Sequence, residues 1–214
     1  MDRWLPLAVF IHSIAVLALQ MNYQEETMKQ LERLDDLTDQ YDVLFCDVWG
    51  VVHNGVTAYP AAIEALKRAR AKGVTVILVT NSPRPHPDVE KQMLGLGVPV
   101  DTYDRVVTSG DVTRDLIAEG PRKVFHIGCE RELTIYDGLD VELVEEFEAS
   151  GVVCTGLYDD ESETPDDYKE LLARLRSRNL PFICANPDIM VERGTRLIWC
   201  AGALAREYGQ LGGR

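Results

Sequence analysis

The sequence has few basic residues for its size. Its 22 lysines and arginines face 35 acidic residues, which gives a formal net charge of −13. A nucleic-acid partner requires basic stripes that meet phosphates, so this balance argues against one. No G-x-G-x-x-G motif and no G-x-x-x-x-G-K-[ST] motif occurs, so neither the usual dinucleotide site nor a P-loop NTPase is indicated.

Cysteine pairs of the C-x-x-C type are also absent. The odd number of cysteines, and their position in or near apolar runs, favour buried free thiols in a reducing compartment, here the cytoplasm, over a zinc site or a disulfide framework. The five cysteines are Cys46, Cys129, Cys154, Cys184 and Cys200. Cys46 precedes Asp47, but neighbouring side chains on a strand point to opposite faces, so we expect Cys46 to be a packed thiol.

No apolar run reaches the roughly 20 residues that a transmembrane helix needs. The longest lies in an apolar N-terminal extension over residues 1–21, from Leu5 to Leu19. It has the length of a signal-peptide core, but Asp2 offsets Arg3 and the end of the run is a poor cleavage site. We favour a non-native or upstream-initiated extension, with a signal peptide second and a membrane anchor third.

The rest of the sequence alternates segments typical of strands and helices, which predicts a parallel sheet with right-handed crossovers. An amphipathic leader helix is expected over 24–38. The other expected helices are 61–72, 88–96, 112–118, an acidic helix around 141–149, and 166–178. The expected strands are 41–46, 74–79, 105–107, 123–127, 151–155 and 181–185. Acidic side chains at 142–148 and 159–161 are expected to face solvent.

Two of the expected strands end in side chains suited to phosphate chemistry. The first ends in Asp47, and the second ends in Thr80-Asn81-Ser82. The carboxyl ends of parallel strands bind ligands in open α/β folds. There an aspartate can attack phosphorus while a hydroxyl and backbone N–H groups hold the phosphate oxygens. The alternatives are that Asp47 caps its turn and that Thr80-Asn81-Ser82 caps the next helix.

The order and spacing of these segments resemble the haloacid dehalogenase superfamily, in particular its class IIA, the NagD-like phosphatases. The resemblance covers roughly residues 28–212 and includes further short segments at 108–110, 124–128, 154–156, 185–188 and 200–203. It implies an α/β fold with a Rossmann-like core, whose parallel sheet is incomplete here, and an inserted α/β cap of the C2 type. The implied domains are 22–110 (first part of the core), 111–205 (cap) and 206–214 (start of the return to the core, truncated).

The resemblance also implies the site and its ligands. Asp47 would be the nucleophile and, with the backbone carbonyl of Trp49, a ligand of Mg²⁺. Thr80 and the backbone N–H of Asn81 would hold the phosphate of a small phosphorylated metabolite. In the cap, Asp188 belongs to a turn with Asn186 that would face the substrate. An oligomer is possible, and the identity of the substrate stays open.

The chain departs from the family pattern at Trp49 and at its C-terminal end. Trp49 stands where these phosphatases usually carry a second aspartate, the general acid, which is worth roughly 100- to 10,000-fold in rate. Trp49 would instead stack on substrate, fill the vacated space or simply pack, and His53 is the nearby histidine that could replace the acid. No Gly-Lys-Pro and no late Gly-Asp-x-x-x-Asp occurs, and the chain ends at Arg214, so we expect a truncated chain or a fragment.

Two functions follow from these observations. The first is a phosphohydrolase that acts on a small phosphate ester through a phosphoaspartate at Asp47 with Mg²⁺. The alternative is a catalytically impaired or truncated protein of the same fold that binds a phosphorylated metabolite, or a partner, without turnover.

Overall fold

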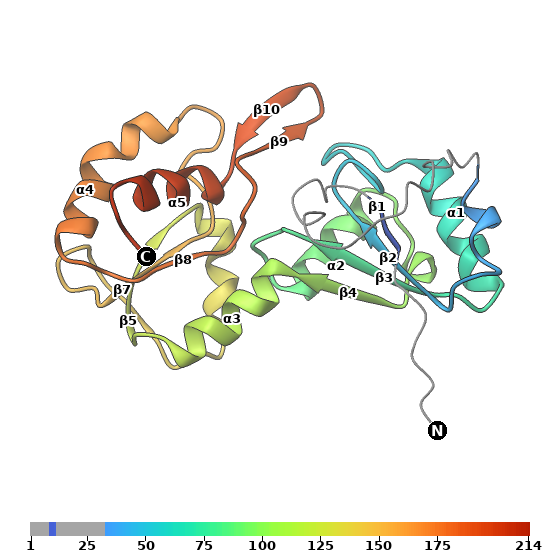
Figure 1. Cartoon of the computed structure of the whole chain (residues 1–214), viewed down its shortest axis with the longest axis horizontal. Coiled ribbons are helices and arrows are strands. Elements are labelled where there is room, and N and C mark those ends of the chain that lie inside the picture. Colours follow the sequence, from blue (N-terminus) through green and yellow to red (C-terminus); the bar gives the residue numbers. More distant parts are fainter. Residues whose placement is uncertain (1–8, 12–32) are drawn as a thin grey trace, which may run out of the picture. The chain divides into compact units, whose positions relative to one another are not determined.

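The computed structural model describes residues 9–11 and 33–214, which belong to two compact units (Figure 1). The first unit comprises Met1–Val79 and Met93–Val106, and the second comprises Thr80–Gln92 and Val107–Arg214. The boundary falls within strand β3 (Thr75–Thr80), helix α2 (His86–Gly95) and strand β4 (Arg105–Thr108).

The first unit is built on a sheet with the strand order β1-β2-β3-β4. Its strands are β1 (Val9–Ile11), β2 (Val43–Asp47), β3 (Thr75–Thr80) and β4 (Arg105–Thr108), and its helices are α1 (Pro60–Ala71) and the end of α2 (His86–Gly95). A 3-10 turn spans Val100–Thr102. Alternate residues of β2 and β3 are buried, as the period of a strand requires. Pro60 begins α1 at the position where proline lacks only a hydrogen bond that the helix does not make.

The N-terminal part of the chain contributes one strand to this sheet. β1 lies within the expected extension and pairs in parallel with β2, with Phe10 opposite Phe45. The rest of the extension, and residues 24–32 of the expected leader helix, lie outside the described residues. The end of that helix was predicted wrongly, because residues 33–38 form no α-helix and contain just a 3-10 turn at Leu34–Asp36. There the Thr38 hydroxyl donates to the Asp35 carbonyl at 2.8 Å, taking an acceptor that a continuing helix would use.

The second unit is a parallel sheet covered by helices on both faces, as Figure 1 shows. Its order is β6-β5-β7-β8. In β7 (Gly151–Cys154), Val152 and Cys154 pack with Leu172 of α4 (Lys169–Ser177) and Leu204 of α5 (Ala201–Gln210). Val153 packs on the other side with Ile117 of α3 (Ser109–Glu119). Burial on both faces explains why β7 is apolar throughout. The α/β fold predicted from the sequence is confirmed.

The elements of the second unit follow in chain order. They are α3 (Ser109–Glu119), β5 (Lys123–Ile127), a 3-10 helix (Glu130–Tyr136), β6 (Glu142–Leu143), β7 (Gly151–Cys154), a 3-10 turn (Pro165–Tyr168), α4 (Lys169–Ser177), β8 (Phe182–Cys184), β9 (Met190–Arg193), β10 (Arg196–Trp199) and α5 (Ala201–Gln210). Apart from the leader helix and the acidic segment, the expected strands and helices are present, with ends shifted by up to three residues.

Several elements of this unit differ from expectation. The acidic helix around 141–149 was predicted wrongly, because the Glu142 and Val144 N–H groups donate to the Arg122 and Val124 carbonyls and form edge strand β6. The β9–β10 hairpin and α5 were not anticipated. Residues 206–214, for which the start of a return to the core stays a prediction, lie in the second unit, where the Tyr208 hydroxyl donates to the Leu180 carbonyl at 2.6 Å.

Over residues 9–11 and 33–214, no helix combines the length and the apolar character that crossing a membrane requires.

Candidate functional site

Asp47 is the last residue of β2, where the sequence places the nucleophile. In the parallel pairing of β2 with β3, Asp47 lies opposite Val79, the residue that precedes Thr80. The strand pair therefore ends in a carboxylate and a threonine at the same edge. The Val48 N–H donates to Asp47 Oδ1 at 2.7 Å, which fixes the orientation of the half-buried carboxylate.

The loop after Asp47 is held by its own backbone. The Gly50 N–H donates to the His53 carbonyl at 2.7 Å, and the Val52 N–H donates to the Val48 carbonyl at 2.8 Å. Gly50 has a φ of 79°, a conformation that favours glycine. The Tyr59 N–H returns to the Val52 carbonyl at 2.8 Å, so the loop is closed before α1 begins.

Trp49 and His53 pack together inside this loop. Their ring centroids are 5.3 Å apart in an edge-to-face arrangement. His53 is only 1% exposed, and its Nδ1 accepts a hydrogen bond from the Gly55 N–H at 3.0 Å. Because Nδ1 is an acceptor, the imidazole is neutral and carries its proton on Nε2. This geometry favours a packing role for both rings, since a neutral imidazole is a poor substitute for the missing general acid.

Cys46 is not a competing nucleophile. Its side chain is buried, and its Sγ lies 3.1 Å from the Asp47 carbonyl oxygen. Burial and the neighbouring Asp47 carboxylate raise the pKa of Cys46 to about 12, so the thiol stays protonated at neutral pH. The prediction of a packed thiol is confirmed, and all five cysteines are free.

The Thr80-Asn81-Ser82 tip contacts the Asn186–Asp188 turn, and both belong to the second unit. The Asn81 side-chain amide donates to Asp188 Oδ1 at 3.0 Å, so the structure brings together two residues that the resemblance had assigned to substrate binding. Thr80 Oγ1 accepts the Ser82 N–H at 3.2 Å, a bond within the tip, whereas the next helix, α2, begins only at His86, so this bond is not the expected helix cap. A hydroxyl that accepts this bond still has a proton to donate, so this bond and phosphate binding are compatible.

The Asn186–Asp188 turn is fixed from both sides. Asn186 is 9% exposed, and its Oδ1 accepts the Asp188 N–H at 3.0 Å. On the other side α5 begins against the turn. A Cβ on Gly202 would lie 2.3 Å from the Pro187 carbonyl oxygen, so only glycine allows this approach.

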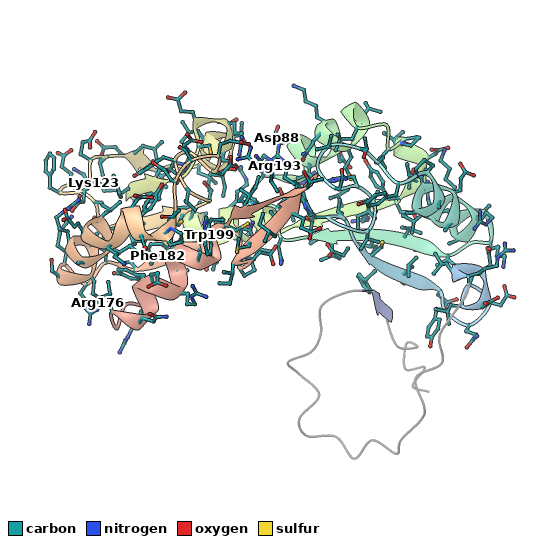
Figure 2. All side chains as sticks on the ribbon, turned by 90° about the horizontal axis from the view of Figure 1, so that it is seen from above. Asp88, Lys123, Arg176, Phe182, Arg193 and Trp199 are labelled. Atoms are coloured by element: carbon teal, nitrogen blue, oxygen red, sulfur yellow. The ribbon has the colours of Figure 1, made fainter. Side chains whose placement is uncertain are left out.

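Sequence reasoning missed a charged cluster around Asp160. This carboxylate was expected in a solvated loop, but its side chain is only 12% exposed and pairs with Arg131 at 2.5 Å and Arg193 at 2.7 Å. Burial opposes its ionisation, yet the two arginines outweigh burial and hold the pKa of Asp160 below its usual range. Figure 2 labels Arg193, which ends strand β9. No local pattern predicted this cluster, because its members are distant in sequence.

Two further ionisable groups lie near the carboxyl end of β5. Glu132 is 7% exposed; burial raises the pKa of its carboxyl, and Oε2 has no hydrogen-bond partner among the residues that the structure describes. His126 shares a hydrogen bond with the Tyr136 hydroxyl at 2.8 Å, and burial lowers the pKa of His126 to about 4. The His126 imidazole is therefore neutral at neutral pH, and burial disfavours the charged form of Glu132.

The chemistry of the donors near Asp47 fits a weakly held Mg²⁺. The Asp47 carboxylate and a backbone carbonyl, such as that of Trp49, are oxygen ligands, and Mg²⁺ keeps several waters when few protein ligands are offered. Within the described ranges 9–11 and 33–214, no group of three or more histidine, cysteine or acidic side chains is arranged to hold a metal ion.

Comparisons with known proteins found a similar sequence profile and similar solved structures. A sequence profile described as haloacid dehalogenase-like hydrolase matches residues 44–142. A hydrolase of the haloacid dehalogenase-like family from Brucella suis 1330 is 84% identical, with a TM-score of 0.85, over 86% of this chain and 70% of that one. No match was found among curated proteins.

Two more distant solved structures show the fold. The 4-nitrophenylphosphatase from Thermotoga maritima is 21% identical, with a TM-score of 0.62, over 83% of this chain and 67% of its own. NagD from Escherichia coli K-12 is 23% identical, with a TM-score of 0.54, over 81% of this chain and 66% of its own. The chain thus spans about two thirds of the length of these structures and has the fold of NagD-like, class IIA proteins.

Proposed function

Because the chain belongs to the haloacid dehalogenase-like hydrolase family, we propose that it hydrolyses a small-molecule phosphate ester through a phosphoaspartate at Asp47. The observation that carries the proposal is the parallel register of β2 and β3, which ends the two strands in Asp47 and Thr80. The 4-nitrophenylphosphatase activity named for the Thermotoga structure supports a phosphate ester as the substrate class.

In this proposal the Asp47 carboxylate oxygen forms a bond to phosphorus, and the ester oxygen leaves with the electron pair of the broken bond. Water then attacks the phosphoaspartate, which releases inorganic phosphate and regenerates the carboxylate. The Thr80 hydroxyl and the Asn81 backbone N–H bind phosphate oxygens and stabilise the charge that develops on them. Mg²⁺, held by Asp47 and the Trp49 carbonyl, would supply positive charge at the phosphate.

Departure of the leaving group is the step for which this site has no assigned proton donor. Trp49 cannot donate a proton, and His53 is placed as a neutral packing residue. An ester whose alcohol departs readily as an anion needs no acid, whereas an alkyl ester does. We therefore expect aryl phosphates to be hydrolysed faster than alkyl phosphates.

The test is phosphate release from 4-nitrophenyl phosphate and from glycerol 3-phosphate, with and without Mg²⁺. We expect Mg²⁺-dependent turnover of the aryl ester, and its loss in the Asp47→Asn variant. The Trp49→Asp variant should accelerate the alkyl ester by about 100- to 10,000-fold, the usual worth of a general acid, and change the aryl ester less.

Asp42→Asn is the matched control, because Asp42 is an exposed carboxylate that precedes the same strand. It should retain wild-type turnover. Turnover that survives in Asp47→Asn would remove Asp47 as the nucleophile. Absence of turnover in the wild-type chain, with phosphate esters still bound, would favour the second candidate function.

That second candidate is a protein of this fold that binds a phosphorylated metabolite without hydrolysing it. Trp49 is the specific observation in its favour, since the position of the usual acid is occupied by an indole packed against His53. For either function the five free cysteines support a reducing compartment, and we propose the cytoplasm.

A further inference from the structure

The Thr80-Asn81-Ser82 tip, proposed above to bind phosphate, makes two hydrogen bonds of its own. The Ser82 N–H donates to Thr80 Oγ1 at 3.2 Å, and the Arg84 N–H donates to Ser82 Oγ at 3.4 Å. Neither bond involves Asn81, whose backbone N–H is one of the two proposed phosphate donors and whose side chain is exposed. These local bonds therefore shape the tip but leave the direction of Asn81 open.

The start of α3 holds the part of the chain that follows Asn81. The Gly110 N–H donates to the Ser82 carbonyl at 3.0 Å, and both residues belong to the second unit. A Cβ on Gly110 would collide with the Arg84 carbonyl, so glycine is needed for this approach. This side of the tip is thus anchored through backbone groups, and these contacts do not include Asn81.

Asp188, in the same unit, is the anchor of Asn81. The Asn81 side-chain Nδ2 donates to Asp188 Oδ1 at 3.0 Å, across 107 positions of the sequence. A hydrogen bond to a carboxylate is charge-assisted and about twice as strong as one between neutral groups. Because the amide group and the backbone N–H belong to one residue, holding the side chain also restricts the torsions that set the direction of the N–H.

Asp188 is itself fixed by its surroundings. Its N–H donates to Asn186 Oδ1 at 3.0 Å, and Asn186 is only 9% exposed. At the start of α5 the Cys200 N–H donates to the Ile189 carbonyl at 3.0 Å, which holds the chain directly after Asp188. Asp188 is half-buried, so water competes less for its carboxylate than it would at an exposed position. The turn therefore offers Asn81 a fixed acceptor.

The charge of Asp188 argues against a direct contact with phosphate. Carboxylate and phosphate oxygens are both negative and both accept hydrogen bonds, so they repel one another unless a proton or a cation lies between them. The Asn81 amide already binds Oδ1 of this carboxylate. Asp188 is therefore better suited to hold Asn81 than to bind the phosphate itself.

We propose that Asp188 is a positioning residue, which holds the Asn81 side chain and so orders the tip before phosphate binds to the Asn81 backbone N–H. This inference rests on the proposed function for the phosphate site. Without the bond to Asp188 the tip would have to be ordered at the moment of binding, and the conformational entropy lost then would lower the affinity. The bond needs an acceptor at position 188, but it does not need a negative charge there.

The test measures the dissociation constant of inorganic phosphate by calorimetry on the 214-residue chain, in the presence of Mg²⁺. Asp188→Ala removes the acceptor and should weaken binding about 5- to 30-fold, the fold-change that corresponds to ordering the backbone of one residue. Asp188→Asn keeps an oxygen that can accept from Asn81 and should restore most of the affinity. A residue that acts through its charge, on a metal ion or on the ligand, would show no such rescue.

Asn81→Ala removes the other half of the bond and leaves the backbone N–H in place. It should weaken phosphate binding as much as Asp188→Ala does. The double variant should be no weaker than either single variant, because both changes break the same interaction. Asp115→Ala is the matched control, since Asp115 is an exposed aspartate of α3 in the same unit. It should bind phosphate like the wild type, and thermal unfolding checks that every variant is folded.

Three results would overturn the inference. Wild-type affinity in Asp188→Ala would mean that the tip needs no anchor. Binding as weak in Asp188→Asn as in Asp188→Ala would mean that Asp188 acts through its charge. Losses that add in the double variant would mean that Asp188 and Asn81 act on the ligand separately.

The same measurements separate this inference from the proposed function. Phosphate binding does not require turnover, whereas phosphate release from 4-nitrophenyl phosphate depends on Asp47. The expected pattern of affinities without turnover would support the positioning role and remove the hydrolase. Turnover that Asp47→Asn abolishes, together with wild-type affinity in Asp188→Ala, would support the hydrolase and remove the positioning role. Absence of phosphate binding by the wild-type chain would remove both.

Discussion

The two units of this chain position their functional side chains by different means. In the first unit the loop after Asp47 is held by backbone hydrogen bonds, a glycine turn and the His53 ring. Its ion pairs lie away from that loop and range from Lys67–Asp101, where the Asp101 side chain is 66% exposed, to Asp35, which is 16% exposed and pairs with Arg33 and Arg68. In the second unit the Asp160 carboxylate is only 12% exposed and joins Arg131 and Arg193.

This difference determines what should disturb each unit. Backbone hydrogen bonds do not titrate near neutral pH, so the loop after Asp47 should keep its shape over a wide pH range. A partly buried carboxylate between two arginines stabilises the fold only while it is ionised. Changes of charge and pH should therefore act more on the Asp160 cluster than on the loop after Asp47, and three variants break or sharpen this contrast.

The largest effect should come from the core of the second unit. Leu204 in α5 is 0% exposed and lies in the core between the sheet and helix α4. Leu204→Ala removes buried methyl groups and leaves a cavity, which should lower the free energy of unfolding of this unit by about 2–5 kcal/mol. Hydrogen exchange should show lost protection in β7, while β2 and β3 keep theirs.

The control for Leu204→Ala is Leu197→Ala in β10, because Leu197 is 63% exposed in the same unit. This control should change the free energy of unfolding by no more than about 0.5 kcal/mol. Equal loss of protection in β2, β3 and β7 on Leu204→Ala would show that the two units unfold together, which contradicts the contrast drawn between them.

A smaller effect is expected for Asp160→Asn. The pKa of Asp160 is depressed in the folded state, so its stabilisation is complete above the unfolded pKa of about 3.9 and is lost as pH falls through the lower, folded pKa. At pH 7 the variant should be less stable by about 2 kcal/mol, between the values for exposed and fully buried pairs. The difference from wild type should shrink as urea unfolding is repeated at falling pH below 4.

Asp101→Asn supplies the comparison in the first unit. Its exposed pair with Lys67, at 3.0 Å, should contribute at most about 1 kcal/mol. If Asp160→Asn proved as mild as Asp101→Asn at pH 7, the cluster around Asp160 would be no more than a surface network.

How well the sequence predicts this structure depends on how far apart in the sequence the contacting residues lie. The Asp47 strand and its glycine turn follow from local alternation and composition, and both are present. The acidic segment at 141–149 favours a helix locally. Pairing with β5 makes part of it a strand, however, and turns follow that strand. The Asp160 contacts join residues 29 and 33 positions apart, which no local pattern encodes. The Asn81–Asp188 contact spans 107 positions, and only the family resemblance associated these two residues with one site.

The smallest effect, and the closest test of the first unit, concerns His53. Its Nδ1 accepts the Gly55 N–H at 3.0 Å, and its ring packs on Trp49. His53→Leu keeps an apolar group but removes the acceptor, which should cost about 1 kcal/mol in the free energy of unfolding because half-buried Gly55 can still reach water. His53→Asn offers Oδ1 near the position of Nδ1 and should recover part of that loss. Exchange of the Gly55 amide, measured by NMR, should be faster in His53→Leu than in His53→Asn. Equal exchange in the two variants would mean that packing against Trp49, rather than this hydrogen bond, holds the loop that follows Asp47.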